Sequence, residues 1–137
     1  MKATVYFATN RHLLGDGTEP SHYAGESGPA GLPGRVTHAM GFVEGTDLAQ
    51  LESGRLSSIQ GVAGDDFSQA LQDDLTSGRN LLIFLHGFAN SFTDSITRAA
   101  FNREWLAASG VPAADCSVVS FSWPSRGIVV DPGDIIA

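Results

Sequence analysis

The chain has 137 residues, 42% hydrophobic and 17% charged, which suits one globular domain with a real core and excludes wholesale disorder. Its net charge of −7, with 8 Lys and Arg against 15 Asp and Glu, argues against a nucleic-acid partner, because phosphate binding needs clustered cations. One cysteine cannot form an internal disulfide, and the sequence predicts neither a secretory signal nor a membrane span, so we expect a cytoplasmic protein.

The first 62 residues predict a loop-rich N-terminal extension. The run Thr4 to Ala8 (TVYFA) is rich in β-branched and aromatic residues, which is typical of a strand. Residues 15–34 are dense in Gly, Pro and Ser without periodicity, so we predict a long surface loop. Residues 35–45 (RVTHAMGFVEG) resemble a short strand with a turn. We expect 1–62 to form a single domain with the core that follows.

The predicted core, residues 63–137, opens with a helix and an apolar strand. In DDFSQALQDDLTSG (65–78), apolar residues at positions 67, 70, 71 and 75 form one helical stripe, and we interpret Asp73 and Asp74 as a solvated face. Gly78 suits a left-handed stop. The run LLIFL (81–85) has no polar alternation, which predicts a central parallel strand buried on both faces.

A second helix is predicted from Phe92 to Ser109, followed by a strand. Ser91 is a good N-cap, and Asp94 completes a capping box three residues later. The run SVVSFSW (117–123) is typical of a strand. Strand, helix and strand make a βαβ unit with parallel strands. We therefore expect an α/β fold, with a parallel sheet that is mixed at its N-terminal edge and has flanking helices.

Two strand ends carry the candidate site. Ligands of an open parallel sheet lie beyond the carboxyl ends of its strands. His86, Gly87, Phe88 and Ala89 follow the first strand of the βαβ unit, and residues 123–127 end the second. We expect Gly87 to let the backbone bend sharply, so that the Phe88 and Ala89 amides point outward at a developing negative charge. Such donors are each worth about 2.7–4 kcal/mol in an oxyanion hole.

The runs VYFATNR, LLIFLHGFANSFTDSITRAA and VVSFSWPSRG resemble bacterial α/β-hydrolases of unknown function, which are esterase- or lipase-like. The resemblance implies a partial α/β-hydrolase fold. It also implies that the Phe88 amide is an oxyanion donor and that His86 is a structural part of the turn. Trp123 and Ser125 would line or brace the same crevice.

The chain departs from that family in one respect. No G-x-S-x-G elbow occurs in the 137 residues, so the nucleophile, acid and base are absent from them. We expect the N-terminal portion of a serine hydrolase that acts on carboxylic esters or related acyl bonds, without a cofactor. The alternative is a noncatalytic half or a truncated piece, inactive alone, that associates with itself or with a complementary C-terminal chain.

Several polar residues have simpler explanations than catalysis. We interpret Ser125 as a turn residue beside the crevice, because Trp123 replaces the leading glycine of an elbow. Ser91 serves better as an N-cap than as a nucleophile. The other histidines lack the spacing of zinc ligands, so we expect no metal site; they are His12, His22 and His38.

Overall fold

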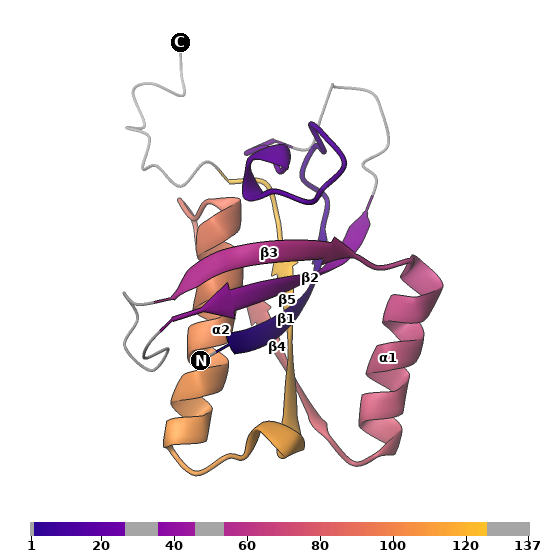
Figure 1. Cartoon of the computed structure of the whole chain (residues 1–137), viewed down its shortest axis with the longest axis vertical. Coiled ribbons are helices and arrows are strands. Elements are labelled where there is room, and N and C mark those ends of the chain that lie inside the picture. The colour runs from indigo at the N-terminus through magenta and orange to yellow at the C-terminus, as the bar shows by residue number, and fades with distance from the viewer. Residues whose placement is uncertain (1, 27–35, 46–53, 126–137) are drawn as a thin grey trace.

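The computed structural model describes residues 2–26, 36–45 and 54–125, which form a five-stranded sheet with two α-helices (Figure 1). The strand order is β3-β2-β1-β5-β4. Three strands pair antiparallel at the N-terminal edge, and the β1–β5 and β5–β4 pairs are parallel, which confirms the predicted mixed α/β fold. The elements are β1 (Lys2–Thr9), η1 (Pro20–His22), β2 (Thr37–Glu44), β3 (Arg55–Gly61), α1 (Gly64–Thr76), β4 (Asn80–Leu85), α2 (Phe92–Ala108), η2 (Ala113–Asp115) and β5 (Cys116–Ser122).

The segment that the sequence describes as loop-rich contributes three strands of this sheet. β1 and β2 lie where strands are predicted, whereas β3 is an addition. Its sequence, RLSSIQG, buries only Leu56 and Ile59, so its apolar pattern is too sparse to indicate a strand. Pairing with β2 holds β3 in place. The division into an extension and a core stays a prediction.

The two helices cover opposite faces of the sheet (Figure 1). Successive side chains of a strand point to opposite faces. Val5 and Phe7 are fully buried in a cluster that includes Ile96 of α2, whereas Tyr6 packs edge-on against Phe67 of α1 at 6.0 Å. The main core therefore lies between the sheet and α2, which fixes the position of the turn that precedes this helix.

The ends of both helices follow the sequence prediction. The Ser91 side chain accepts a hydrogen bond from the Asp94 amide, and the Asp94 carboxylate accepts one from the Ser91 amide, so the capping box is confirmed. Gly78 and Gly110 follow α1 and α2 with φ values of +87° and +102°, in the left-handed region that glycine tolerates.

Two burial predictions are wrong within the described residues. β4 lies at the edge of the sheet and pairs only with β5 there, and its Ile83 and Leu85 are 64% and 65% exposed. An unbroken apolar run cannot distinguish a covered strand from one whose cover is missing. The stripe of α1 is also mostly uncovered, because Phe67 is its one buried member and Leu75 is 56% exposed.

The predicted surface loop is partly packed. Among its described residues, Tyr23 is buried, stacks on Phe92 of α2 with ring centroids 4.1 Å apart, and donates a hydrogen bond to the Gly17 carbonyl oxygen. A bridge between Leu13 and Tyr23 closes this segment beside the carboxyl end of β1. Residues 27–34 of the predicted loop lie outside the described residues.

Candidate functional site

The turn after β4 is fastened to the end of β5 by His86 and Trp123. Their rings stack 4.6 Å apart with an interplanar angle of 9°. Trp123 Nε1 donates a 3.0 Å hydrogen bond to the His86 carbonyl oxygen, and His86 Nε2 lies 3.0 Å from the Trp123 carbonyl oxygen. His86 is 4% exposed, and its Nδ1 lies 2.9 Å from the Gly87 carbonyl oxygen. A neutral imidazole carries one N–H and can donate to only one of these two carbonyl oxygens at a time, and the ring lies between them as a structural anchor would.

Asn90 organises the carbonyl groups of the same turn. Its buried side-chain amide donates to the carbonyl oxygens of Gly87 at 2.9 Å and Phe88 at 3.3 Å. Within the described part of the chain, the backbone N–H groups of Phe88 and Ala89 have no hydrogen-bond acceptor. The turn therefore uses its carbonyl groups internally and leaves two adjacent amides free to donate.

The unusual backbone conformation falls at Ala89 and not at the expected glycine. Ala89 has a φ of +62°, in the left-handed region that an alanine seldom adopts, whereas Gly87 has no such φ. A Cβ at Gly87 would meet only the Asn90 side chain, at an ordinary 3.5 Å. The sharp bend that the sequence analysis assigns to Gly87 is therefore made two residues later. Strained non-glycine residues of this kind gather at functional sites.

Arg11, which the sequence analysis does not single out, lies behind this turn. It is 2% exposed and joins three segments to the strand end. Its Nη2 donates to the Asn90 carbonyl oxygen at 3.2 Å, and its Nη1 donates to those of Ala24 at 3.0 Å and Ser125 at 2.6 Å. Its Nε donates to the Ser122 hydroxyl at 2.8 Å. One side chain thus fixes the β4 turn against the residues that follow β5.

Among the described residues, the Arg11 charge has no carboxylate partner. No Asp or Glu of the described residues lies within ion-pair distance of the guanidinium, whose acceptors are all neutral. Burial lowers the pKa of Arg11 to about 10, so the group is still a cation at neutral pH. A buried positive charge favours a negative ligand nearby. The sequence feature that could have indicated this role of Arg11 is its position, as a cation two residues after a largely apolar strand.

The serines near the turn make structural contacts. Ser122 is fully buried and lies 2.8 Å from the Ser95 hydroxyl, and its carbonyl oxygen accepts a 2.6 Å hydrogen bond from the Thr9 hydroxyl. Ser91 caps α2. Ser125 is half-buried and contributes its carbonyl oxygen to Arg11. No histidine of the described ranges is hydrogen-bonded to any of these hydroxyls. Residues 126 and 127 lie outside the described residues.

The remaining site expectations concern metals and membranes. Across the described ranges, no three His, Cys, Asp or Glu side chains gather as metal ligands would. Neither α-helix of the described ranges has the length and apolar character needed to cross a bilayer.

A mixed sheet whose parallel β4 and β5 are connected by α2, with the β4 turn lying against the end of β5, defines an α/β protein. The family model described as an alpha/beta hydrolase of unknown function (DUF900) matches residues 63–133, and the chain belongs to this family. No curated protein and no solved structure matches the chain.

Proposed function

We propose that this chain supplies the oxyanion-binding turn of a serine hydrolase that acts on carboxylic esters or related acyl bonds. The backbone N–H of Phe88 is the first donor and that of Ala89 the second. The observation that carries the proposal is the state of this turn: its two amides have no acceptor among the described residues, while Asn90 occupies the neighbouring carbonyl groups. Membership of an α/β-hydrolase family supports the reaction class.

In this proposal the turn contributes to catalysis by electrostatic stabilisation of an oxyanion. When a serine oxygen bonds to an acyl carbon, the carbonyl π electrons move to the carbonyl oxygen, which becomes an oxyanion. Amides held in advance stabilise that charge without reorganising, at about 2.7–4 kcal/mol for each donor. Arg11 contributes by holding Asn90 and by its positive charge, not by touching the substrate. His86, Gly87, Trp123 and Ser125 form or brace the wall of the crevice.

The nucleophile, base and acid come, in this proposal, from a polypeptide segment other than these 137 residues. The sequence contains no G-x-S-x-G, both ring nitrogens of His86 face carbonyl oxygens, and Ser122 is fully buried. The outer edge of β4 offers a place for that segment, because it pairs with no described strand and exposes Ile83 and Leu85. Unpaired apolar edges of this kind recruit a further strand.

The proposal is tested with a fluorophosphonate probe and short-chain p-nitrophenyl esters. The 137-residue chain alone should show neither labelling nor turnover. The product of the full reading frame, or this chain mixed with a complementary C-terminal chain, should be labelled on a serine that lies outside these residues. Labelling of Ser125 in the isolated chain would show that our assignment of the nucleophile is wrong.

A second candidate function is a noncatalytic interaction module, which the exposed β4 edge favours. In that case the chain acts by pairing with a second copy or with another chain, and the turn has only a structural role. Light scattering and equilibrium unfolding show whether the isolated chain associates or is a simple monomer. A clean monomer that unfolds in one sharp transition would contradict the association. The acyl substrate and the cytoplasmic location remain part of the proposal.

A further inference from the structure

A cavity of about 350 Å³ lies at the opposite end of the sheet from the candidate site. Pairing between β1 and β5 begins only at Tyr6 and Val119, so the first residues of the two strands are not paired with each other. The cavity is lined by the first residues of these two strands, 2–4 and 116–118, together with residues of both helices. Because β5 rises about 3.3 Å per residue, the cavity is roughly 20 Å from the Trp123 end.

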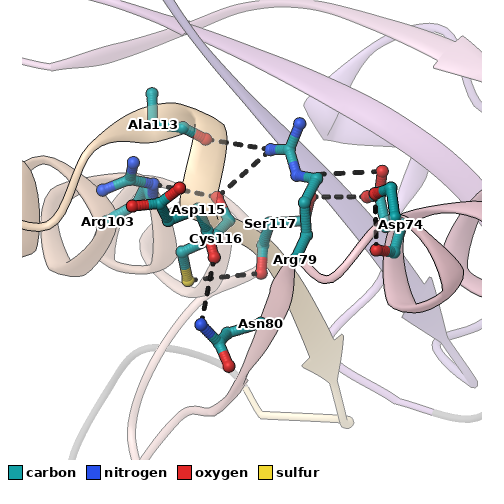
Figure 2. Close-up of polar contacts among 9 residues, drawn as sticks. Asp74, Arg79, Asn80, Arg103, Ala113, Asp115, Cys116 and Ser117 are labelled. Carbon is teal, nitrogen blue, oxygen red and sulfur yellow. Dashed lines mark hydrogen bonds and ion pairs between the residues drawn. The ribbon is translucent and has the colours of Figure 1, made fainter.

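Two arginines converge on one neutral acceptor at this cavity. Arg79 Nη2 and Arg103 Nε donate to the Cys116 carbonyl oxygen, at 3.3 and 3.1 Å, and Figure 2 shows the two guanidinium groups on either side of it. Arg79 also donates to the Ala113 carbonyl oxygen at 3.0 Å, and Arg103 to that of Val111 at 3.3 Å. Every hydrogen-bond acceptor of these two arginines among the described residues is a backbone oxygen, which does not neutralise their charge.

The carboxylates nearby do not balance this charge. Arg103 is 5% exposed, and no Asp or Glu in the described ranges lies within ion-pair distance of it. Its Nη2 is buried without a hydrogen-bond partner. Asp74 lies 3.8 Å from Arg79, a long contact, and its other oxygen accepts the Ser117 hydroxyl (Figure 2). Buried cations are ordinarily paired, so the described residues leave Arg103 without an anion.

We propose that this cavity binds a small oxyanion, such as the phosphate or carboxylate group of a small polar molecule. Arg79 Nη1 has no acceptor among the described residues and supplies two free N–H donors. Lys2 also lines the cavity, with its ammonium nitrogen 4.5 Å from the centre of the Phe42 ring. The planar guanidinium fork is suited to phosphate and carboxylate oxygens. Glu104 also lines the cavity and disfavours highly charged anions. The site is independent of the proposed acyl chemistry.

The test is a titration of the isotopically labelled 137-residue chain with sodium phosphate and, separately, sodium acetate, against sodium chloride at equal ionic strength. We expect saturable shifts of the Arg79, Cys116 and Ser117 amide signals. Tighter binding of phosphate than acetate assigns a phosphate group, and the reverse assigns a carboxylate. The absence of saturable, local shifts with either anion overturns the proposal.

Two substitutions make the test specific. Arg79→Gln keeps a polar side chain at a position that is one-third exposed, so the fold should survive, and we expect binding about tenfold weaker. Arg98→Gln removes an exposed arginine elsewhere on α2 and should leave the affinity unchanged. Equal binding by the wild type and Arg79→Gln, or equal weakening by Arg98→Gln, would show that the anion does not occupy this cavity.

Discussion

Trp123 and His86 hold each other by a stacked pair of rings and by contacts to each other's backbone. The Trp123 indole donates to the His86 carbonyl oxygen at 3.0 Å, while His86 Nε2 lies 3.0 Å from the Trp123 carbonyl oxygen. The residues are 37 positions apart in the chain, and each directly follows a strand of the βαβ unit. This pair sets the spacing between the β4 turn and the end of β5.

Trp123→Phe should lower the free energy of unfolding by about 1–3 kcal/mol, because it removes the indole donor and part of the stacked surface. Urea unfolding measures the change. Trp105→Phe is the matched control, since Trp105 is 61% exposed on α2, and its effect should stay below about 0.5 kcal/mol. Equal effects of the two substitutions would contradict a fastening role for Trp123.

Arg11→Met should destabilise the chain by about 3 kcal/mol or more, because it leaves several buried acceptors without a donor. Arg11→Lys keeps the charge but cannot span acceptors in three segments, so it should recover only part of the loss. Arg98→Met, at an exposed position, should change stability by less than about 0.5 kcal/mol. Full rescue by lysine in urea unfolding would show that charge alone matters.

Tyr23 predicts a loss of stability at high pH. Burial and the nearby charge of Asp16 raise the pKa of the Tyr23 hydroxyl to about 12 from its usual 10. The folded state therefore binds more protons than the unfolded state between these values, so this contribution is complete below pH 10 and is lost as the pH rises through 12. The stability difference between wild type and Tyr23→Phe isolates it, because both proteins retain Arg11. A difference that does not fall over this range would contradict the assignment.

Ala89→Gly should stabilise the chain by up to about 1 kcal/mol, because glycine adopts a φ of +62° without the steric cost that alanine bears. Ala107→Gly, within α2, should instead destabilise by about 1 kcal/mol. Thermal or urea unfolding of both variants gives the comparison. If the two glycines lower stability alike, the left-handed conformation at Ala89 is not a source of strain.

Ile83→Lys should reduce self-association of the isolated chain, because it places a charge on β4, whose outer edge pairs with no described strand. Leu75→Lys replaces a comparably exposed leucine on α1 and should leave association unchanged. Sedimentation velocity across a range of concentrations distinguishes them. If the wild type stays monomeric at all concentrations, the proposal that the β4 edge is a pairing surface is wrong.

Features with a local cause were predictable from the sequence. The Ser91–Asp94 capping box and the Gly78 helix end depend on residues within a few positions, so their residue types suffice. The βαβ unit was also predictable, because LLIFL is a continuous apolar run and SVVSFSW is rich in β-branched and aromatic residues. The edge position of β4 was not predictable, because an apolar run indicates that a strand favours burial but does not show whether other elements cover it.

The candidate site was predictable only in part. The sequence placed His86 and Trp123 at neighbouring strand ends, and the structure brings them into contact. Arg11 ends the quoted run VYFATNR, but its role was missed because its acceptors in Asn90 and Ser125 lie 79 and 114 positions away and are backbone carbonyl groups, which residue types do not indicate. The positive φ of Ala89 was missed because alanine carries no propensity for it.

The most direct test of the account concerns the Phe88 and Ala89 amides. In an amide-resolved titration of the isolated chain with acetate at constant ionic strength, both N–H signals should move downfield, separately from any changes at Cys116. Arg11→Lys should weaken this response if Arg11 holds the turn. An unchanged response would contradict the role of Arg11 but not the oxyanion-binding role of the two amides. Phe88 and Ala89 signals that stay still in the wild type, while the rest of the spectrum shows a folded chain, would contradict the oxyanion-binding turn itself.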